Sequence, residues 1–355
     1  MDAATREPDG SMTPEPDGSM IRVTATAIGR VAAGSVEIPA PEAGQVLVRT
    51  RYAGICGSDT HALAGQHPLL APPYVPGHEA VGVIASGDGA GRRVVLKPNV
   101  VCGVCVNCRA GRTNACEVLA WIGCDPTGAR PGAMGEFFLA PSGNLYPVPD
   151  GVDDDQAALV ECLATPVHAA RIAGDLAGAG VVVLGAGTIG VLMIIAARAA
   201  GAERIVVTDP DPVKRERAVR LGADAALDAL AADLGDRVRR ELGGGADVLF
   251  DCVASAGSAR QWPELVRRAA TIAVVGVPAA DLVTPMPAIQ DRELRVQGCA
   301  SYTEDDFAAA LAMAADLPAA EIVSDRFAFA DAATAFDRAV EPGAGKVLIG
   351  PGAGS

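Results

Sequence analysis

The fold of this chain is decided by one stretch of sequence, Val181-Val182-Val183-Leu184-Gly185-Ala186-Gly187-Thr188-Ile189-Gly190. Its first half is a continuous apolar run, as expected of a strand buried on both faces of a sheet. The glycines allow a tight turn and let backbone N–H groups approach a pyrophosphate at the N-terminus of the next helix. A turn without a ligand is the alternative. We predict a dinucleotide site formed by Gly185, Gly187, Thr188, Ile189 and Gly190.

The sequence after this loop continues the same alternation of strand and helix. Residues 204–209, 246–251 and 271–276 are apolar strand candidates with helical stretches between them, which predicts a parallel sheet covered by helices on both faces. Asp209 ends the next strand, where an acid accepts hydrogen bonds from the adenosine ribose and repels a 2′-phosphate. NAD is therefore favoured over NADP. Lys214 and Arg215 keep NADP open, unless they are a solvated helix face.

The sequence before the loop has a different texture. Residues 21–149 contain short β-like runs, such as 46–50 and 80–84, punctuated by Gly and Pro, and predict a β-rich domain. A length of 355 residues with 50% hydrophobic side chains suits two domains. Residues 7–12 recur as residues 15–20, and the composition there predicts a disordered tail.

Charge and cysteine usage limit the classes of partner. The net charge is 29 − 43 = −14, which argues against binding to nucleic acid or to an anionic membrane. The apolar stretch 190–202 contains Arg198 and is too short for a membrane span, so it predicts a buried helix. Nine cysteines without an export signal indicate a reducing cytoplasm. We expect a cytoplasmic homo-dimer or homo-tetramer that acts on a small molecule.

Four of the cysteines form a compact motif. Cys102, Cys105, Cys108 and Cys116 have the pattern C-x2-C-x2-C-x7-C. Four thiolates at such spacings can enclose one tetrahedral Zn²⁺, and a site filled by four protein ligands is structural. An iron–sulfur cluster also takes four cysteines, but nothing else in the sequence indicates electron transfer. Four free thiols in one exposed loop would be open to oxidation.

A second group of polar residues precedes that motif. Cys56 lies in Gly54-Ile55-Cys56-Gly57-Ser58-Asp59-Thr60-His61, and His78 lies in Gly77-His78-Glu79. Cysteine and histidine are both ligand types that zinc prefers. Taken singly, Cys56 can be a small buried side chain and His78 a core histidine. Their neighbours Ser58, Asp59, His61 and Glu79, with Glu161 and Cys162 later in the chain, favour a metal site.

These motifs together resemble the zinc-dependent medium-chain dehydrogenase/reductase superfamily. The resemblance runs from about Val23 to Ile349 and includes Gly135-Glu136-Phe137 and Gly345-Lys346-Val347. It implies an α/β protein with a GroES-like β-rich catalytic domain and a Rossmann doubly wound domain. The expected division is a tail over 1–20, the catalytic domain over 21–162 with its zinc lobe at 102–116, the Rossmann domain over 163–301, and a return to the catalytic domain over 302–355.

The resemblance also assigns roles to single residues. It implies two zinc ions per chain, with Cys56, His78 and Glu161 as catalytic ligands and Glu79 as a further possible ligand. Cys162 follows Glu161 where relatives have proline, which leaves both residues open as the third ligand. The remaining roles implied are Asp59 orienting His78, Thr165 contacting the nicotinamide, and Ser58, the cofactor ribose and His61 forming a proton relay.

The implied activity is hydride transfer from a secondary alcohol to NAD. Glu161 is typical of the polyol and threonine dehydrogenase branches, so a polyol, sugar alcohol or cyclic polyol is the expected substrate. A threonine-type amino-alcohol dehydrogenase is the alternative, although the histidine that such enzymes carry before the cysteine lobe is missing from residues 97–101. A non-catalytic NAD-binding protein on the same fold is a remote alternative.

Overall fold

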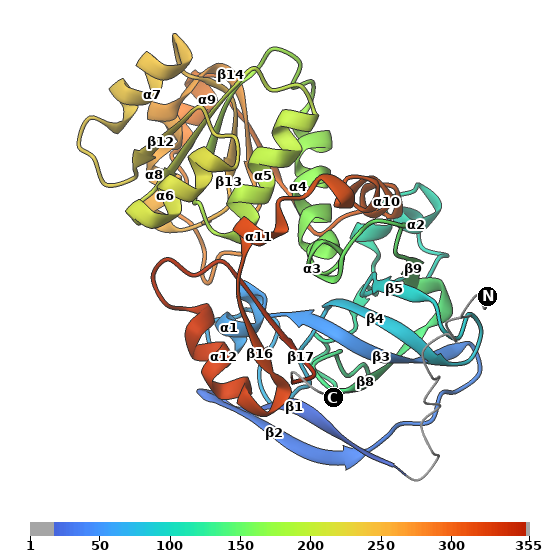
Figure 1. Cartoon of the computed structure of the whole chain (residues 1–355). Coiled ribbons are helices and arrows are strands. Elements are labelled where there is room, and N and C mark those ends of the chain that lie inside the picture. Colours follow the sequence, from blue (N-terminus) through green and yellow to red (C-terminus); the bar gives the residue numbers. More distant parts are fainter. Residues whose placement is uncertain (1–17, 353–355) are drawn as a thin grey trace, which may run out of the picture.

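The computed structural model describes residues 18–352, which form a β-rich lobe and a parallel-sheet lobe (Figure 1). The predicted tail over 1–20 lies outside the described residues except for its last three. Ser19 and Met20 are already part of the first strand, β1 (Ser19–Ala27), which pairs antiparallel with β2 (Arg30–Glu37). The regular structure therefore starts two residues earlier than the sequence pattern indicated.

The parallel-sheet lobe is built on six strands in the order β12-β11-β10-β13-β14-β15, and every pairing is parallel. Numbered along the chain this is 3-2-1-4-5-6, the doubly wound order of a Rossmann fold. It confirms the predicted α/β class. The strands are β10 (Gly180–Leu184), β11 (Arg204–Asp209), β12 (Ala225–Asp228), β13 (Ala246–Asp251), β14 (Val266–Val274) and β15 (Arg295–Gly298).

Helices bury both faces of this sheet because successive side chains of a strand point to opposite sides. Val181 and Val183 of β10 join the core that contains Leu192 of α5, whereas Val182 and Leu184 join the core that contains Trp262 of α8. The apolar residues 181–184 are thus buried on both faces of the sheet. The helices of this lobe are α5 (Thr188–Ala199), α6 (Pro212–Arg220), α7 (Leu234–Leu242), α8 (Ala256–Leu265) and α9 (Met286–Asp291).

The β-rich lobe holds a seven-stranded sheet in the order β16-β17-β3-β4-β5-β9, with β8 paired to β3. The C-terminal strands β16 and β17 join it next to β3, so the last part of the chain returns to this lobe, as Figure 1 shows in red. Its strands are β3 (Gln45–Gly54), β4 (Glu79–Ser86), β5 (Arg93–Leu96), β8 (Phe137–Pro141), β9 (Leu145–Pro147), β16 (Val323–Ala328) and β17 (Lys346–Gly350). Its helical segments are α1 (Gly57–Leu63), η2 (Ser142–Asn144), η4 (Phe329–Asp331) and α12 (Ala332–Ala339).

One long helix, α4 (Val160–Ala173), runs through the predicted domain boundary between residues 162 and 163. Its residues belong to the same buried core as Val81 and Val95 of the β-rich lobe and Val181 of the parallel sheet. This helix therefore ties the two lobes together. The segments packed nearby are α3 (Asp154–Ala158), α10 (Glu304–Ala312), η3 (Ala314–Asp316) and α11 (Ala319–Ile322).

The four-cysteine segment forms a small projection with little regular structure. It consists of β6 (Asn99–Val100), α2 (Val106–Arg109), η1 (Thr113–Ala115) and β7 (Ala120–Trp121), with β6 and β7 paired antiparallel. Over residues 18–352, no helix combines the length and the apolar character needed to cross a membrane.

Candidate active site and metal centres

The glycine loop joins β10 to α5 as the sequence predicted, and two of its glycines are sterically required. Gly185 has φ +91°, and a Cβ on Gly190 would lie 1.9 Å from the Gly185 carbonyl oxygen. Gly187 is the N-cap of α5, and no side chain caps the first turn. Backbone N–H groups at an uncapped helix N-terminus suit a pyrophosphate.

Asp209 lies directly against this loop. Its Oδ2 accepts a hydrogen bond from the Ala186 N–H at 2.8 Å, and its Oδ1 accepts one from the Asp211 N–H at 2.8 Å. A carboxylate has about four acceptor positions, so lone pairs remain for ribose hydroxyls. The Arg215 guanidinium donates to the backbone oxygens of Asp209 and Pro210, both at 2.8 Å, and is therefore engaged locally.

The four cysteines of the projection come together as predicted. Each offers a sulfur within 4.8 Å of the others, with Cys102 Sγ 3.6 Å from Cys116 Sγ and 3.9 Å from Cys108 Sγ. Backbone N–H groups point at the sulfurs; the Cys108 N–H donates to Cys105 Sγ at 3.4 Å. This hydrogen bond is the main reason that the pKa of Cys105 falls to about 6. Thiolates supported in this way fit a closed zinc site.

A second cluster lies where the β-rich lobe meets α4. Cys56 is the N-cap of α1, and Glu79 is the first residue of β4, directly after His78. Ligand atoms of Cys56, His78 and Glu79 lie within 4.8 Å of one another, and His78 and Glu79 are buried. A thiol, an imidazole and a carboxylate at this separation can hold a zinc ion.

Glu79 is neutralised by a lysine from the other end of the chain. Lys346, the first residue of β17, donates from Nζ to both carboxylate oxygens of Glu79, at 2.8 and 2.7 Å. Burial favours the neutral form of Glu79, but the charges of Lys346 and His78 together with hydrogen bonds from Cys162 and Lys346 outweigh it and keep the pKa of Glu79 below its usual value. A Cβ on Gly54 would lie 2.0 Å from Glu79 Oε2, so only glycine leaves room for this carboxylate.

Glu161 is a buried carboxylate in a different situation. It belongs to a group with Glu79 and Cys162, not to one compact group with Cys56 and His78. Its Oε1 accepts a hydrogen bond from the Tyr302 hydroxyl at 2.7 Å, and no basic side chain between residues 18 and 352 forms an ion pair with it. Burial is the main cause that raises the pKa of Glu161 to about 7. A buried carboxylate without a cation is costly, and a bound metal would remove that cost.

The residues predicted for the proton path lie on α1. Ser58 Oγ is buried and has no hydrogen-bond partner in the described part of the chain. His61 is exposed and lies three residues further along the helix, so the two side chains share a face. An unpartnered hydroxyl next to a ligand cluster can accept a bond from a substrate, and an exposed imidazole can exchange protons with water.

Asp59 contacts the start of its own helix more closely than it contacts His78. Its Oδ2 accepts the Cys56 N–H at 3.1 Å, and its Oδ1 accepts the Tyr74 hydroxyl at 3.2 Å. The separation between Asp59 Oδ2 and His78 Nδ1 is 4.0 Å. Asp59 therefore anchors the Cys56 backbone and lies near the His78 ring without a direct hydrogen bond to it.

Three further residues surround the cluster, and the sequence analysis predicted no catalytic or metal-binding role for them. Cys124 Sγ lies 3.2 Å from His78 Nδ1, and the Trp121 ring meets the His78 ring edge-on with centroids 5.9 Å apart. Tyr302, already noted at Glu161, packs against Trp121 with centroids 6.2 Å apart. No local pattern marks these residues, because their contacts bridge segments distant in sequence.

Thr165 and His168 both lie on α4. Thr165 lies one turn after Glu161 on the same face of the helix and is half-buried. His168 is buried; its Nδ1 lies 2.7 Å from Asp306 Oδ2, and its Nε2 lies 3.3 Å from Asn114 Nδ2. His168 therefore belongs to a packing network between α4, α10 and the cysteine projection.

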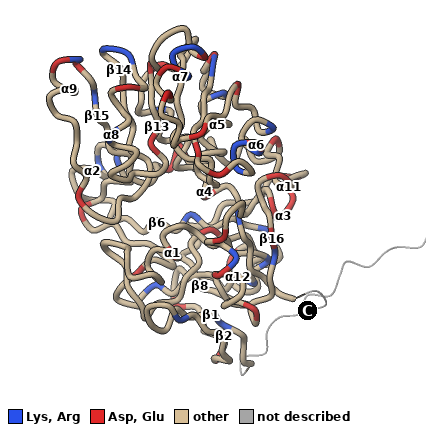
Figure 2. The backbone as a smooth tube through the Cα atoms, turned by 90° about the vertical axis from the view of Figure 1, so that its left-hand side faces the viewer, with Lys and Arg blue, Asp and Glu red and all other residues tan. Residues whose placement is uncertain are grey.

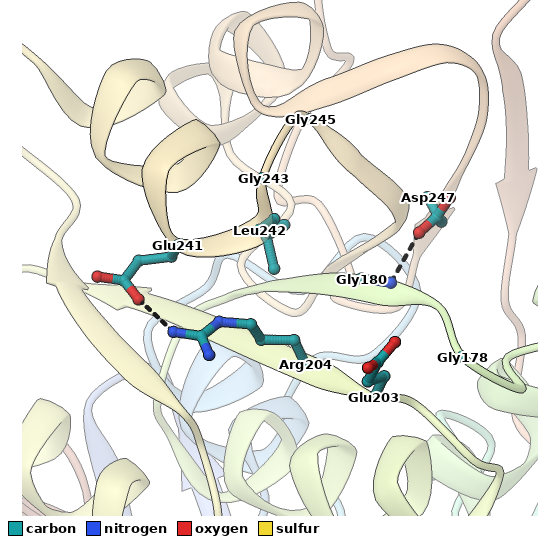
Figure 3. Close-up of a pocket in the computed structure, with 9 residues that line it drawn as sticks. All are labelled: Gly178, Gly180, Glu203, Arg204, Glu241, Leu242, Gly243, Gly245 and Asp247. Atoms are coloured by element: carbon teal, nitrogen blue, oxygen red, sulfur yellow. Dashed lines mark hydrogen bonds and ion pairs between the residues drawn. The ribbon is translucent and has the colours of Figure 1, made fainter.

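A cavity of about 500 Å³ lies away from these groups (Figure 3). Its lining includes Gly180 and Arg204, the first residues of β10 and β11, so it opens at the strand ends opposite the glycine loop. Its polar groups bind one another: Arg204 pairs with Glu241 at 2.7 Å, and Asp247 accepts the Gly180 N–H at 2.7 Å. We assign it no part in the reaction.

Two family models match the chain. The model of the alcohol dehydrogenase GroES-like domain matches residues 42–150, and the model of the zinc-binding dehydrogenase matches residues 188–316. The first contains the Cys56 and His78 cluster and the four-cysteine projection. The second begins inside the glycine loop.

Known proteins are similar over most of the length. L-threonine 3-dehydrogenase of Deinococcus deserti is 32% identical over 328 residues, 88% of this chain and 93% of that relative. L-galactonate-5-dehydrogenase of Escherichia coli K12 is 32% identical over 313 residues, 86% of this chain and 90% of that relative. A zinc-binding dehydrogenase of Sinorhizobium meliloti 1021, solved bound to NADP, is 31% identical with a TM-score of 0.84 and covers 94% of this chain and 100% of that one.

Proposed function

The chain belongs to the zinc-dependent medium-chain dehydrogenase/reductase family, and from this premise we propose that it oxidises a secondary hydroxyl of a polyol, sugar alcohol or cyclic polyol with NAD. Its class is that of a zinc- and nicotinamide-dependent oxidoreductase acting on an alcohol. The observation that carries the proposal is a pair of ligand groups that share Glu79: half-buried Cys56 and buried His78 on one side of it, and buried Glu161 on the other. These side chains have no role in packing that would require so many ionisable groups in one place.

Two zinc sites are proposed. The structural site is formed by Cys102, Cys105, Cys108 and Cys116. The catalytic site is formed by Cys56, His78 and Glu161, with Glu79 as a further possible ligand. Lys346 supports this choice, because it satisfies both oxygens of Glu79 and leaves Glu161 as the carboxylate that lacks a cation.

The residues around the catalytic site handle the proton. Zinc, when bound, polarises an alcohol or carbonyl oxygen as a Lewis acid, and the nicotinamide accepts or returns the hydride. Ser58 Oγ, buried and unpartnered, would accept the hydrogen bond of the substrate hydroxyl and would take its proton while passing its own hydroxyl proton on toward His61 by way of the cofactor ribose. His61, exposed on the same face of α1, releases the proton to water. Asp59 fixes the backbone of Cys56 during turnover.

The cofactor site is proposed from Gly185, Gly187, Thr188, Ile189, Gly190 and Asp209, with Thr165 beside the nicotinamide. Asp209 favours NAD, because a carboxylate facing the ribose accepts bonds from free hydroxyls and repels a 2′-phosphate. The Sinorhizobium protein was solved bound to NADP, so the preference for NAD over NADP is proposed here from Asp209 of this chain and not from that relative.

The substrate class follows from the third ligand. A carboxylate donates less charge to zinc than a thiolate, so the metal remains a stronger acceptor for substrate oxygens, which suits molecules with adjacent hydroxyls. The second candidate is an amino alcohol, because threonine dehydrogenases are among the relatives. No histidine lies between residues 97 and 101, and this weighs against it.

Two variants test the ligand set and the substrate class together. Glu161→Ala should lose affinity for the catalytic zinc by roughly 10–100-fold or more and lose turnover with it, whereas Cys162→Ala should keep the zinc and most of the activity. NADH formation should be higher with vicinal diols and polyols than with propan-1-ol or threonine. If Cys162→Ala loses the zinc and Glu161→Ala keeps it, the assignment is reversed and the polyol proposal loses its main support.

The assembly and setting are also proposed. Strand β15 is an unpaired sheet edge with all four residues exposed, and Val296 on it and Val283 and Met286 before it are exposed apolar side chains. Such an edge favours pairing with a second copy, so we propose a homo-dimer or homo-tetramer. Sedimentation as a monomer would contradict this.

We further propose that the domains are the catalytic domain over 21–162, the Rossmann domain over 163–301 and the return to the catalytic domain over 302–355. We also propose a cytoplasmic location. All nine cysteines are unpaired, which fits a reducing compartment. Acidic and basic residues lie close together along α7, as the colours of the backbone in Figure 2 show, and the net charge is −14, so we expect neither nucleic acid nor membrane as a partner.

A further inference from the structure

We propose that Cys124 holds the His78 ring in position for the catalytic metal, a role that rests on the metal site proposed above. Cys124 Sγ lies 3.2 Å from His78 Nδ1, well within the range of a hydrogen bond to sulfur. His78 is buried, so its ring depends on protein groups for its orientation. Cys124 is thus a positioning residue that acts through His78.

Asp59, the expected partner of His78, lies too far from the ring to bond it directly. Its two oxygens accept hydrogen bonds from the Cys56 N–H and the Tyr74 hydroxyl, at 3.1 and 3.2 Å. The 4.0 Å that separates Asp59 Oδ2 from His78 Nδ1 exceeds a hydrogen bond between nitrogen and oxygen. Among the described side chains, the sulfur of Cys124 is therefore the hydrogen-bond partner of this nitrogen.

The contact determines which nitrogen of His78 faces the metal. A histidine ligand binds through one ring nitrogen and donates the N–H of the other to a nearby acceptor. With Nδ1 directed at Cys124, Nε2 is left for the metal. The Nδ1–H donates to the Cys124 sulfur, which is a weak acceptor. Cys124 thereby fixes both the tautomer and the tilt of the ring.

The segment that carries Cys124 is fastened to the segment that carries His78. A Cβ on Gly123 would lie 2.5 Å from the Gly77 carbonyl oxygen, so the two backbones touch where only glycine fits. The Gly77 carbonyl oxygen also accepts a hydrogen bond from the Ala133 N–H at 2.8 Å, so a third segment is fixed at the same point. Trp121, three residues before Cys124, meets the His78 ring edge-on. Cys124 is therefore held in register with His78 by backbone contacts.

The first experiment measures zinc affinity in the full-length, zinc-loaded protein with Cys124→Ala, Cys124→Ser and the control Cys252→Ala. Cys252 follows β13 and belongs to none of the ligand groups. Competition with a chromophoric chelator should show about 10-fold or greater loss of catalytic zinc affinity in Cys124→Ala, a smaller loss in Cys124→Ser, which keeps an acceptor, and none in Cys252→Ala. Retention of the structural zinc shows that each variant is folded.

The second experiment separates positioning from direct ligation. Cobalt exchanged into the catalytic site should keep its thiolate-to-cobalt absorption in Cys124→Ala, because Cys56 still supplies the sulfur, while the ligand-field bands shift. A weaker thiolate-to-cobalt absorption in Cys124→Ala than in the unmodified protein would mean that Cys124 supplies a second thiolate ligand and would overturn the proposal. Unchanged zinc affinity and unchanged ligand-field bands would reduce Cys124 to packing and overturn it too. If the unmodified protein binds a single zinc, the metal site itself fails, which is a distinct result.

Discussion

Two buried glutamates lie beside each other in this protein and have opposite surroundings. Glu79 has both oxygens bound by Lys346, whereas among residues 18–352 Glu161 accepts a side-chain hydrogen bond only from the hydroxyl of Tyr302. Burial without a cation raises the pKa of Glu161, and the nearby Lys346 keeps that of Glu79 low. When their neighbours shift the pKa values of two carboxylates in opposite directions, the two groups can have different roles. We infer that Glu79 balances the charge of Lys346 and that Glu161 is the carboxylate that binds the metal.

Removal of the Tyr302 hydroxyl tests whether Glu79 and Glu161 have these different roles. Tyr302→Phe keeps the ring that packs against Trp121 but removes the donor to Glu161. We expect catalytic zinc to dissociate about 10-fold faster and kcat to fall, because Glu161 loses the bond that orients it. Zinc release and steady-state kinetics measure this. Unchanged zinc release would mean that Tyr302 only fills space.

Replacement of Asp209 tests the cofactor site. Asp209→Ala should raise KM for NAD and shift the ratio of kcat/KM for NADP over NAD upward by about 10-fold, because an acid at the ribose rewards a free 2′-hydroxyl. Asp209→Asn keeps the size and removes only the charge, so it should relax discrimination with a smaller loss of NAD binding. An unmodified enzyme that uses NADP better than NAD would contradict the placement of Asp209.

At the scale of elements, helix α10 is fastened to α4 by one carboxylate. Asp306 lies 2.7 Å from His168 Nδ1, and Arg171 donates to its two oxygens at 2.7 and 2.9 Å. Burial alone would raise the pKa of Asp306, but hydrogen bonds from His168, Arg171 and Thr303 outweigh it and hold the pKa far below its usual value. Asn114 of the cysteine projection reaches the same histidine. The network joins three elements that lie far apart in sequence.

This network predicts how stability changes with pH. Because the pKa of Asp306 is lower in the folded chain, its contribution is complete above the ordinary value near 3.8 and is lost as pH falls below it. Asp306→Asn should lower the free energy of unfolding at pH 7 by about 2 kcal/mol and should lose less than the unmodified protein on acidification. Urea unfolding at several pH values measures this, with exposed Asp305→Asn as the control. Equal acid sensitivity of the Asp306 and Asp305 variants would exclude this role.

The elements themselves were largely readable from the sequence. Strands β11 and β13 have the predicted bounds, because each has an apolar centre and ends in an aspartate. Strand β14 begins at Val266, earlier than predicted, and its pairing with β13 is irregular near Ala269, a non-glycine residue with φ +59°. An irregularity of that kind has no periodicity to reveal it.

The candidate site was only partly readable. Family motifs pointed to Cys56, His78 and Glu161, but Cys124 and Tyr302 carry no local signature. Tyr302 is 141 residues from Glu161 in sequence, and Cys124 is 46 from His78. Only the folded chain brings these pairs together, so no reading of spacing could have found them.

At the scale of the molecule, the proposed active site draws its residues from both ends of the chain. Cys56 and His78 come from the N-terminal part, Glu161 from the helix that ties the lobes together, and Lys346 from the last strand. We therefore expect metal binding at the proposed catalytic site to depend on the pairing of β17 with the sheet of the β-rich lobe. The four-cysteine projection depends only on residues close in sequence, so the two zinc sites should respond differently to mutation.

The most direct test counts zinc in the unmodified protein and in Cys56→Ser, alongside NADH formation with a panel of alcohols and polyols. The account predicts two zinc ions and activity in the unmodified protein. Cys56→Ser should keep one zinc and unchanged secondary structure and form no NADH, because only the catalytic ligand set is broken. One zinc or none in active enzyme, or two zinc ions retained in an active Cys56→Ser variant, would contradict the assignment of the Cys56, His78 and Glu161 cluster as the catalytic metal site.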